Sequence, residues 1–233
     1  MAAISTIRHK HLFDPDEYKG LPISIIGCGA IGSRVFMALI ELGLEHIRCF
    51  DFDKVEAHNL ANQAFLHTDI GRFKSLALMQ RYQDKTGARP PIHMEALTTK
   101  LPSPDTAPQP AGIVFLMTDS FDSRRDIANT CLKDNARVFR VFDARMGSTH
   151  GEILHFNPNI QQEYESWLKT IGDDSLPAET SPCGSSVSVG TTASIMANLA
   201  VIQMVHFLTN PVACDSHIKV FLKPTVVAAE TLK

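Results

Sequence analysis

The sequence predicts an α/β fold with a Rossmann-like, largely parallel sheet and antiparallel strands near the C-terminus. Short apolar runs alternate with longer segments of helical periodicity, a pattern typical of βαβ units. A glycine-rich turn follows the first apolar run directly, and acidic residues follow two of the later runs. The composition agrees, because 44% hydrophobic and 20% charged residues are ordinary for a globular protein.

The first expected unit is a strand, a helix and a second strand. Residues 23–26 form a short apolar run that suits a buried parallel strand. Apolar residues recur at helical spacing across residues 30–42, and Gly43 stands where a C-terminal cap is expected. Residues 46–50 then form the second strand. The glycine-rich turn therefore lies inside a complete βαβ unit.

The later elements continue this alternation. We expect a helix at 72–85, an edge strand at 90–96, a strand at 112–117, a helix at 121–133, a strand at 137–142, an antiparallel strand at 151–156, a short helix at 160–171, a long apolar helix at 189–208 and closing strands within 217–229. Residues 1–21 are interpreted as an N-terminal arm, either a surface tail or a segment that packs on a partner subunit. Residues 22–233 are interpreted as a single nucleotide-binding domain.

Charge and hydropathy narrow the classes of partner. The net charge of -3 does not favour nucleic acid. No uninterrupted apolar run reaches the ~18–20 residues of a membrane helix, and no signal peptide is recognisable. Five scattered cysteines without a CxxC pair indicate reduced thiols. We therefore expect a cytoplasmic protein without a membrane or nucleic-acid partner.

The glycine-rich turn has a physical interpretation. Gly27 permits the tight turn, Gly29 lets the backbone approach a phosphate, and Gly32 allows close packing of helix and strand. Ala30 and Ile31 begin the helix, where free N–H groups and a partial positive charge attract an anion. The turn predicts a phosphate-binding site.

Acidic and basic residues beyond the turn extend this site. Asp51 ends the second strand about 20 residues after the glycines, where an acid can bind a ribose, and this predicts an adenine nucleotide. Lys74 begins a helix, a place that disfavours a cation unless an anion is near; the alternative is a solvated surface lysine. Asp119 ends a strand at the ligand-binding edge, with capping of the next helix as the alternative.

Several motifs, in order, resemble one family over nearly the whole chain. The sequence is similar to the MoeB/ThiF and ubiquitin-activating adenylation family in five motifs. These are the GxGxxG of Gly27 to Gly32, Asp51-Phe52-Asp53-Lys54-Val55, Asn59-Leu60-Ala61-Asn62-Gln63, Ile70-Gly71-Arg72-Phe73-Lys74, and Thr118-Asp119-Ser120 with Arg124 downstream.

The resemblance implies an ATP-dependent adenylyltransferase. Members activate the C-terminal carboxylate of a ubiquitin-like or sulfur-carrier protein with ATP and Mg²⁺, and work as homodimers. By resemblance, Asp51 holds the ribose, Lys74 neutralises phosphate charge and Asp119 binds Mg²⁺. Arg8, with Lys10 as second choice, would enter the partner subunit's site. The resemblance adds four residues of the loops after the second strand to the nucleotide site, Asp53, Asn59, Asn62 and Gln63.

This sequence departs from the family pattern in ways that bear on activity. Asn62 replaces the loop arginine, so either another base such as Arg72 substitutes, or adenylation is weak, or the geometry differs. Ser120 replaces the asparagine after the aspartate. The zinc-binding CxxC pairs are missing, which predicts no zinc. Cys183 stands where several members carry a thioester- or persulfide-forming cysteine; the alternative is a structural thiol.

Other functions remain open at this stage. An NAD(P)-dependent oxidoreductase would share the glycines and Asp51 but would leave Lys74 and Asp119 without a role. A catalytically degenerate, carrier-binding subunit is favoured by Asn62. Adenylation of a small molecule, a peptide or tRNA is a further alternative.

Overall fold

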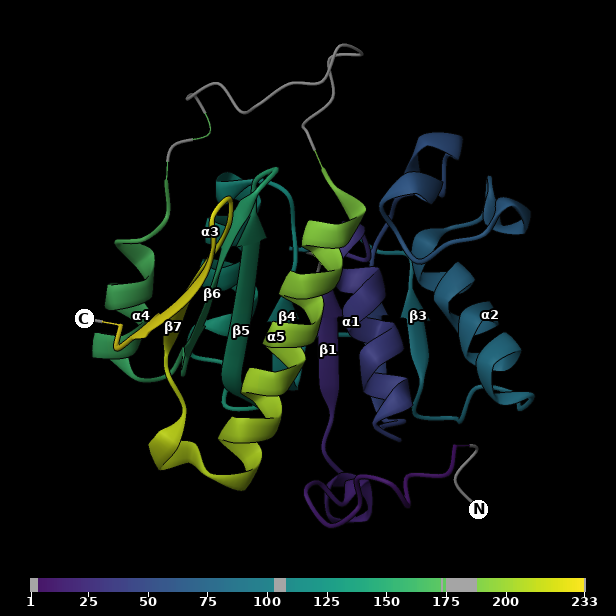
Figure 1. Ribbon diagram of the computed structural model, residues 1–233, viewed down its shortest axis with the longest axis horizontal. Helices are drawn as coiled ribbons and strands as arrows, with labels where there is room; N and C mark the ends of the chain where they lie inside the picture. The colour runs from purple at the N-terminus through teal and green to yellow at the C-terminus, as the bar shows by residue number, and fades with distance from the viewer. Residues whose placement is uncertain (1–3, 103–107, 173, 175–187, 233) are drawn as a thin grey trace.

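The computed structural model describes residues 4–102, 108–172, 174 and 188–232. Within these residues one eight-stranded sheet has the order β3-β2-β1-β4-β5-β6-β7-β8 (Figure 1). Strands β3, β2, β1, β4 and β5 pair in parallel, and β5 to β8 pair antiparallel. The strands are β1 Ile23–Ile26, β2 Ile47–Phe50, β3 Glu95–Leu97, β4 Gly112–Leu116, β5 Val138–Met146, β6 His150–Phe156, β7 His217–Leu222 and β8 Thr225–Glu230. The predicted fold class is confirmed.

Helices cover both faces of the sheet. Figure 1 shows α1, α2 and α5 on the near face, where their apolar side chains form one core cluster with the sheet. Helices α3 and α4 contribute to a second cluster on the opposite face. The helices are α1 Ala30–Glu41, α2 Lys74–Thr86, α3 Phe121–Ile127, α4 Gln161–Leu168 and α5 Gly190–Thr209, with short turns η1 Pro15–Tyr18, η2 Ala57–Ala61, η3 His67–Asp69, η4 Ala128–Leu132 and η5 Pro211–Ala213.

The boundaries of α2 and α3 differ from the prediction. Helix α2 begins at Lys74 and not at Arg72, because Arg72 and Phe73 are engaged in extended pairing. The carbonyl of Arg72 accepts from the Val55 amide at 2.8 Å, and Phe73 forms a β-bridge with Lys54. The helix predicted at 121–133 changes after Ile127 into the π-helical turn η4.

Helix α5 is long and apolar enough to span a membrane by composition alone. It packs against α1, β5 and β6, so its character is that of a core helix. Ala197 and Ala200 are buried against this core, whereas Ile195 and Ile202 remain exposed on the outer side of the helix.

The N-terminal arm is only partly a surface tail. Arg8 is exposed, but Phe13 is buried and its ring stacks on Tyr18 with centroids 5.0 Å apart. The Tyr18 hydroxyl donates to the Leu208 carbonyl at 3.3 Å. The aromatic pair therefore fastens the second half of the arm to the C-terminal end of α5, which a polar composition did not indicate.

The strand order reverses at one point, where open α/β sheets commonly bind ligands. The chain adds β2 and β3 on one side of β1 and then β4 and β5 on its other side. The connections that follow β1 and β4 therefore lead to opposite sides of the boundary between these two strands. The two carboxyl ends are in close contact, because a Cβ added to Gly27 would lie 2.7 Å from the Met117 carbonyl oxygen. The glycine-rich turn and the Thr118–Asp119 segment therefore share one edge of the sheet.

Candidate active site

Two glycines of the glycine-rich turn are required by packing, and the third has free space around it. Gly27 has a φ of 87°, which a side chain would strain, and a Cβ on Gly32 would lie 1.9 Å from the Gly27 carbonyl oxygen. A Cβ on Gly29 would meet no atom within 4 Å. Packing thus explains Gly27 and Gly32. It does not explain Gly29, whose bare backbone leaves room for a ligand.

Helix α1 presents an uncapped amino terminus at this turn. No side chain caps the helix at Gly29, and its first turn contains no acidic residue. The first N–H groups of a helix, here those of Ala30 and Ile31, have no intrahelical acceptor. This end of α1 can accept a phosphate or carboxylate.

Asp51 holds the glycine-rich turn against the end of β2. Its carboxylate accepts from the Cys28 amide at 2.7 Å and from the Asp53 amide at 2.8 Å. Burial raises the pKa of Asp51, and the two backbone amides oppose that shift. A carboxylate has about four acceptor positions, so Asp51 can still accept from a ribose hydroxyl.

Lys74 is directed to the same edge by the pairing of its neighbours. The Lys74 amide donates to the Asp53 carbonyl at 2.8 Å, and its ammonium lies 3.0 Å from the Asp53 carboxylate. Lys74 is only 9% exposed, so the alternative of a solvated surface lysine is wrong. The Asp53 carboxylate is half-exposed and leaves Lys74 able to meet a second anion.

The loop after β2 brings unsatisfied oxygens to this edge. Asn59 is buried and caps η2, where its side-chain oxygen accepts from the Glu56 amide at 2.9 Å. Four buried side-chain oxygens near this edge lack a hydrogen-bond partner: those of Asn62 and Gln63 in this loop, of Thr118 after β4 and of Ser188 before α5. Buried polar groups are normally paired, so these oxygens indicate that a polar ligand or water completes the site.

Asp119 follows β4 and is exposed. The cap of α3 is Ser120, whose hydroxyl accepts from the Ser123 amide at 3.1 Å, so the capping alternative for Asp119 is wrong. The described residues contain no group of three or more His, Cys, Asp or Glu that could hold a metal ion. One carboxylate still fits Mg²⁺, which is commonly held by one or two carboxylates together with water and substrate phosphates.

A buried charge cluster behind this edge of the sheet was missed in the sequence. Asp143 is fully buried and accepts from Arg124, from Arg145 at 2.6 Å and from the Trp167 indole at 2.8 Å. Arg124 also donates to the carbonyls of Leu116 and Thr118. The cluster therefore ties the carboxyl ends of β4 and β5 together just behind Asp119. Its sequence signal was the i, i+2 spacing of Asp143 and Arg145 on one face of a strand.

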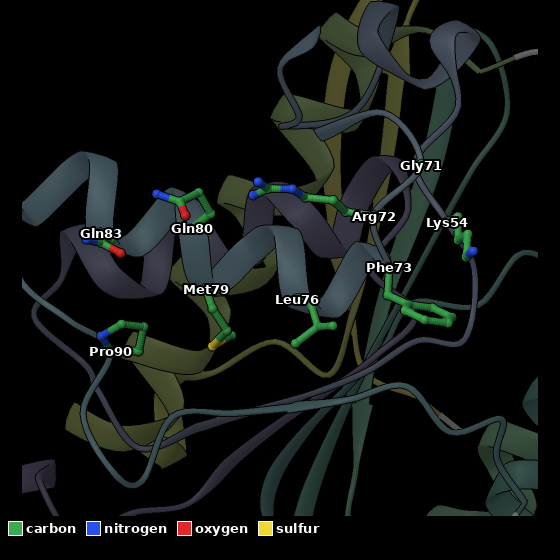
Figure 2. A pocket seen from close by; sticks show the side chains of 9 residues that line it. All are labelled: Lys54, Gly71, Arg72, Phe73, Leu76, Met79, Gln80, Gln83 and Pro90. Atoms are coloured by element: carbon green, nitrogen blue, oxygen red, sulfur yellow. The ribbon is translucent and has the colours of Figure 1, made fainter. Parts of the chain in front are cut away.

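The structure does not bring every predicted residue to this edge. Arg8 belongs to the arm, whose Thr6 packs beside Gly43 at the far end of α1, about 18 Å from the glycine turn by helix length (Figure 1). Cys183 lies outside the described residues. Arg72 is exposed and lines a surface cavity of about 440 Å³ on the outer side of α2, and Figure 2 shows its side chain running toward Gln80.

The comparisons with known proteins agree with this geometry. A family model described as the ThiF family matches residues 16–229. The chain belongs to the ThiF family. No curated protein matches the chain significantly.

Solved structures share the fold of this chain over most of its length. MccB of E. coli with AMPCPP and MccA has 17% identity and a TM-score of 0.68 over 93% of this chain and 65% of its own. The microcin C7 biosynthetic enzyme MccB with N-formylated MccA has 17% identity and a TM-score of 0.73, over 93% of this chain and 66% of its own. PaaA has 16% identity and a TM-score of 0.71, over 96% of this chain and 67% of its own. The chain thus spans about two thirds of the length of these proteins, and at this identity they establish the fold.

Proposed function

We propose that this ThiF-family protein is an ATP-dependent adenylyltransferase that activates a carboxylate as an acyl adenylate, in the cytoplasm. The observation that carries the proposal is the convergence at the β1/β4 edge. The open Gly29 and the uncapped end of α1 lie there with Asp51 and the buried Lys74. Family membership and the MccB structure with ATP support the choice of nucleotide over NAD(P).

The reaction requires charge to be held on phosphate oxygens. The substrate carboxylate attacks the α-phosphorus; a new carboxyl O–P bond forms, and the bond to the bridging oxygen breaks with release of pyrophosphate. The Lys74 ammonium and the N–H groups of α1 stabilise the charge that develops, since such catalysis is mainly positioning and electrostatics. Asp51 orients the ribose. Mg²⁺, bound through Asp119, would neutralise further phosphate charge.

For the substrate, we propose the C-terminus of a ubiquitin-like or sulfur-carrier protein. The MccB structures contain MccA, so a peptide carboxylate is the second candidate and is favoured by that observation. Both candidates present the same reacting group. They differ in the surface that must recognise the rest of the substrate.

Pyrophosphate exchange into ATP tests the proposal. Labelled pyrophosphate should enter ATP only when a carrier ending in Gly-Gly is present, or instead when a peptide with a free C-terminus is present. The matched control is the same carrier or peptide with a C-terminal carboxamide, which cannot attack phosphorus. ATP binding without exchange with any of these substrates would support a carrier-binding subunit, and protection from heat by NAD but not by ATP would support an oxidoreductase.

We also propose a homodimer in which Arg8 enters the partner subunit's site. The exposed Ile195 and Ile202 give α5 an apolar outer side, and the exposed Leu12 of the arm lines a hollow beside it. Arg8 lies too far from its own glycine turn to act there. An interface over α5 would bring a second arm to the molecule.

Mixing two inactive variants tests this arrangement. Arg8→Ala and Asp119→Ala subunits are each expected to lack exchange activity while keeping the fold. Their equimolar mixture should regain about a quarter of wild-type activity, because half of the dimers are mixed and each mixed dimer has one intact site. Failure to regain activity, with mixed dimers demonstrated by differential tagging, would show that Arg8 does not act in trans.

A further inference from the structure

Arg34 lies beside the phosphate end of the proposed site, on the second turn of α1. It is four residues after Ala30 and so stands on the same face of the helix. Its Nε donates to the Asn62 carbonyl at 3.4 Å. A Cβ added to Gly190, the first residue of α5, would lie 3.3 Å from a terminal nitrogen of Arg34. The guanidinium is thus set between the loop after β2 and the start of α5.

The surroundings of Arg34 are electrostatically unbalanced. No carboxylate of the described residues forms an ion pair with Arg34. Both α1 and α5 direct amino termini without acidic residues into this region, and each carries partial positive charge. Burial also lowers the pKa of Arg34. A partly buried guanidinium next to two positive helix ends favours an anion as its neighbour.

The neighbours of Arg34 are polar groups that a ligand would complete. The Asn62 amide nitrogen donates to the Ser188 carbonyl at 3.4 Å, which joins the loop to the segment before α5. The side-chain oxygens of both Asn62 and Ser188 are buried without a partner. A hydrated polyphosphate can accept from the guanidinium and, through its water molecules, donate to these two oxygens.

We propose that Arg34 binds the β- and γ-phosphates of ATP, an assignment that rests on the proposed function and adds a residue to its site. In the family pattern the loop residue at position 62 is an arginine, and here it is an amide. Arg34 contacts this residue from α1 and supplies the missing positive charge. Arg72 does not, because it lines the cavity on the outer side of α2. A bidentate guanidinium suits a polyphosphate, and AMP has no group at this position.

The test is the affinity of the full chain for ATP and for AMP, measured by calorimetry at fixed salt. Arg34→Gln should weaken ATP binding about tenfold to a hundredfold, the usual effect of losing charged hydrogen bonds, and leave AMP binding unchanged. The matched control is Arg137→Gln, which removes an exposed arginine just before β5, at the opposite edge of the sheet. Thermal unfolding without nucleotide checks that both variants fold.

A second variant separates phosphate binding from a structural role. The Arg34→Gln, Asn62→Arg double variant places a guanidinium at position 62, in the loop that Arg34 contacts. Its affinity for ATP should recover, and its affinity for AMP should stay constant. Equal loss of ATP and AMP affinity, or no loss of either, would overturn the assignment of Arg34. If the unaltered protein binds no ATP, the proposed function fails and this inference fails with it.

Discussion

Lys74→Met is expected to lower carboxylate-dependent pyrophosphate exchange about a hundredfold to a thousandfold, the usual cost of removing one group that stabilises charge in the transition state. Lys74 is the largely buried cation at the edge where the phosphates are proposed to lie, and its Asp53 partner is half-exposed. Methionine has a similar length, so it fills the same space. Water can solvate the released Asp53 carboxylate, and the fold should therefore persist.

The comparison that isolates the role of Lys74 is Lys85→Met on the same helix. Lys85 lies in the last turn of α2 and pairs with Glu41 at 2.5 Å on the surface, far along the helix from the glycine turn. Exchange should be unchanged in this control. Wild-type exchange rates in Lys74→Met, at saturating ATP and substrate, would contradict the proposed chemistry of the site.

Asp143→Asn is expected to reduce the free energy of unfolding by about 3–5 kcal/mol, the usual cost of removing one partner from a buried ion pair. The change keeps the shape of the side chain but leaves Arg124 and Arg145 buried without their shared counter-charge. Urea unfolding followed by the fluorescence of Trp167, the only tryptophan, reports this region directly because the indole donates to Asp143.

The control is Asp122→Asn, which breaks a surface pair with Arg125 of 2.6 Å and should cost less than about 1 kcal/mol. Equal stabilities of the two variants would show that the cluster does not hold the ends of β4 and β5.

The pH dependence of the Asp143 variant has a defined sign. Burial raises the pKa of Asp143, but the guanidinium groups of Arg124 and Arg145 outweigh burial and hold it below its usual value. A depressed pKa in the folded state stabilises the protein above the unfolded pKa of about 3.9, and that stabilisation is lost as pH falls through the folded value. The difference between wild type and Asp143→Asn should therefore be constant near neutral pH and narrow below about pH 4.

Local pattern was sufficient to predict the geometry of the first βαβ unit. The glycine turn, the strand before it and Asp51 lie within one βαβ unit, so short-range spacing specifies their geometry. The place of Lys74 at a helix start was also readable. The prediction failed at the boundary of that helix, because the pairing of Phe73 with Lys54 is a contact between separate segments.

The sequence by itself determined the fold class, the sheet edge that carries the glycine-rich turn and the order of the motifs, because each depends on the period of hydrophobic residues and on glycine at defined positions. Only the tertiary structure decided which charges meet. In the structure Lys74 pairs with Asp53, and Ser120 caps α3. Asp143 is buried between two arginines. Arg34 contacts Asn62 and lies beside the start of α5. These contacts depend on how strands and helices that are distant in the chain pack together. The spacing of residues in the sequence does not report the distance between such segments in space.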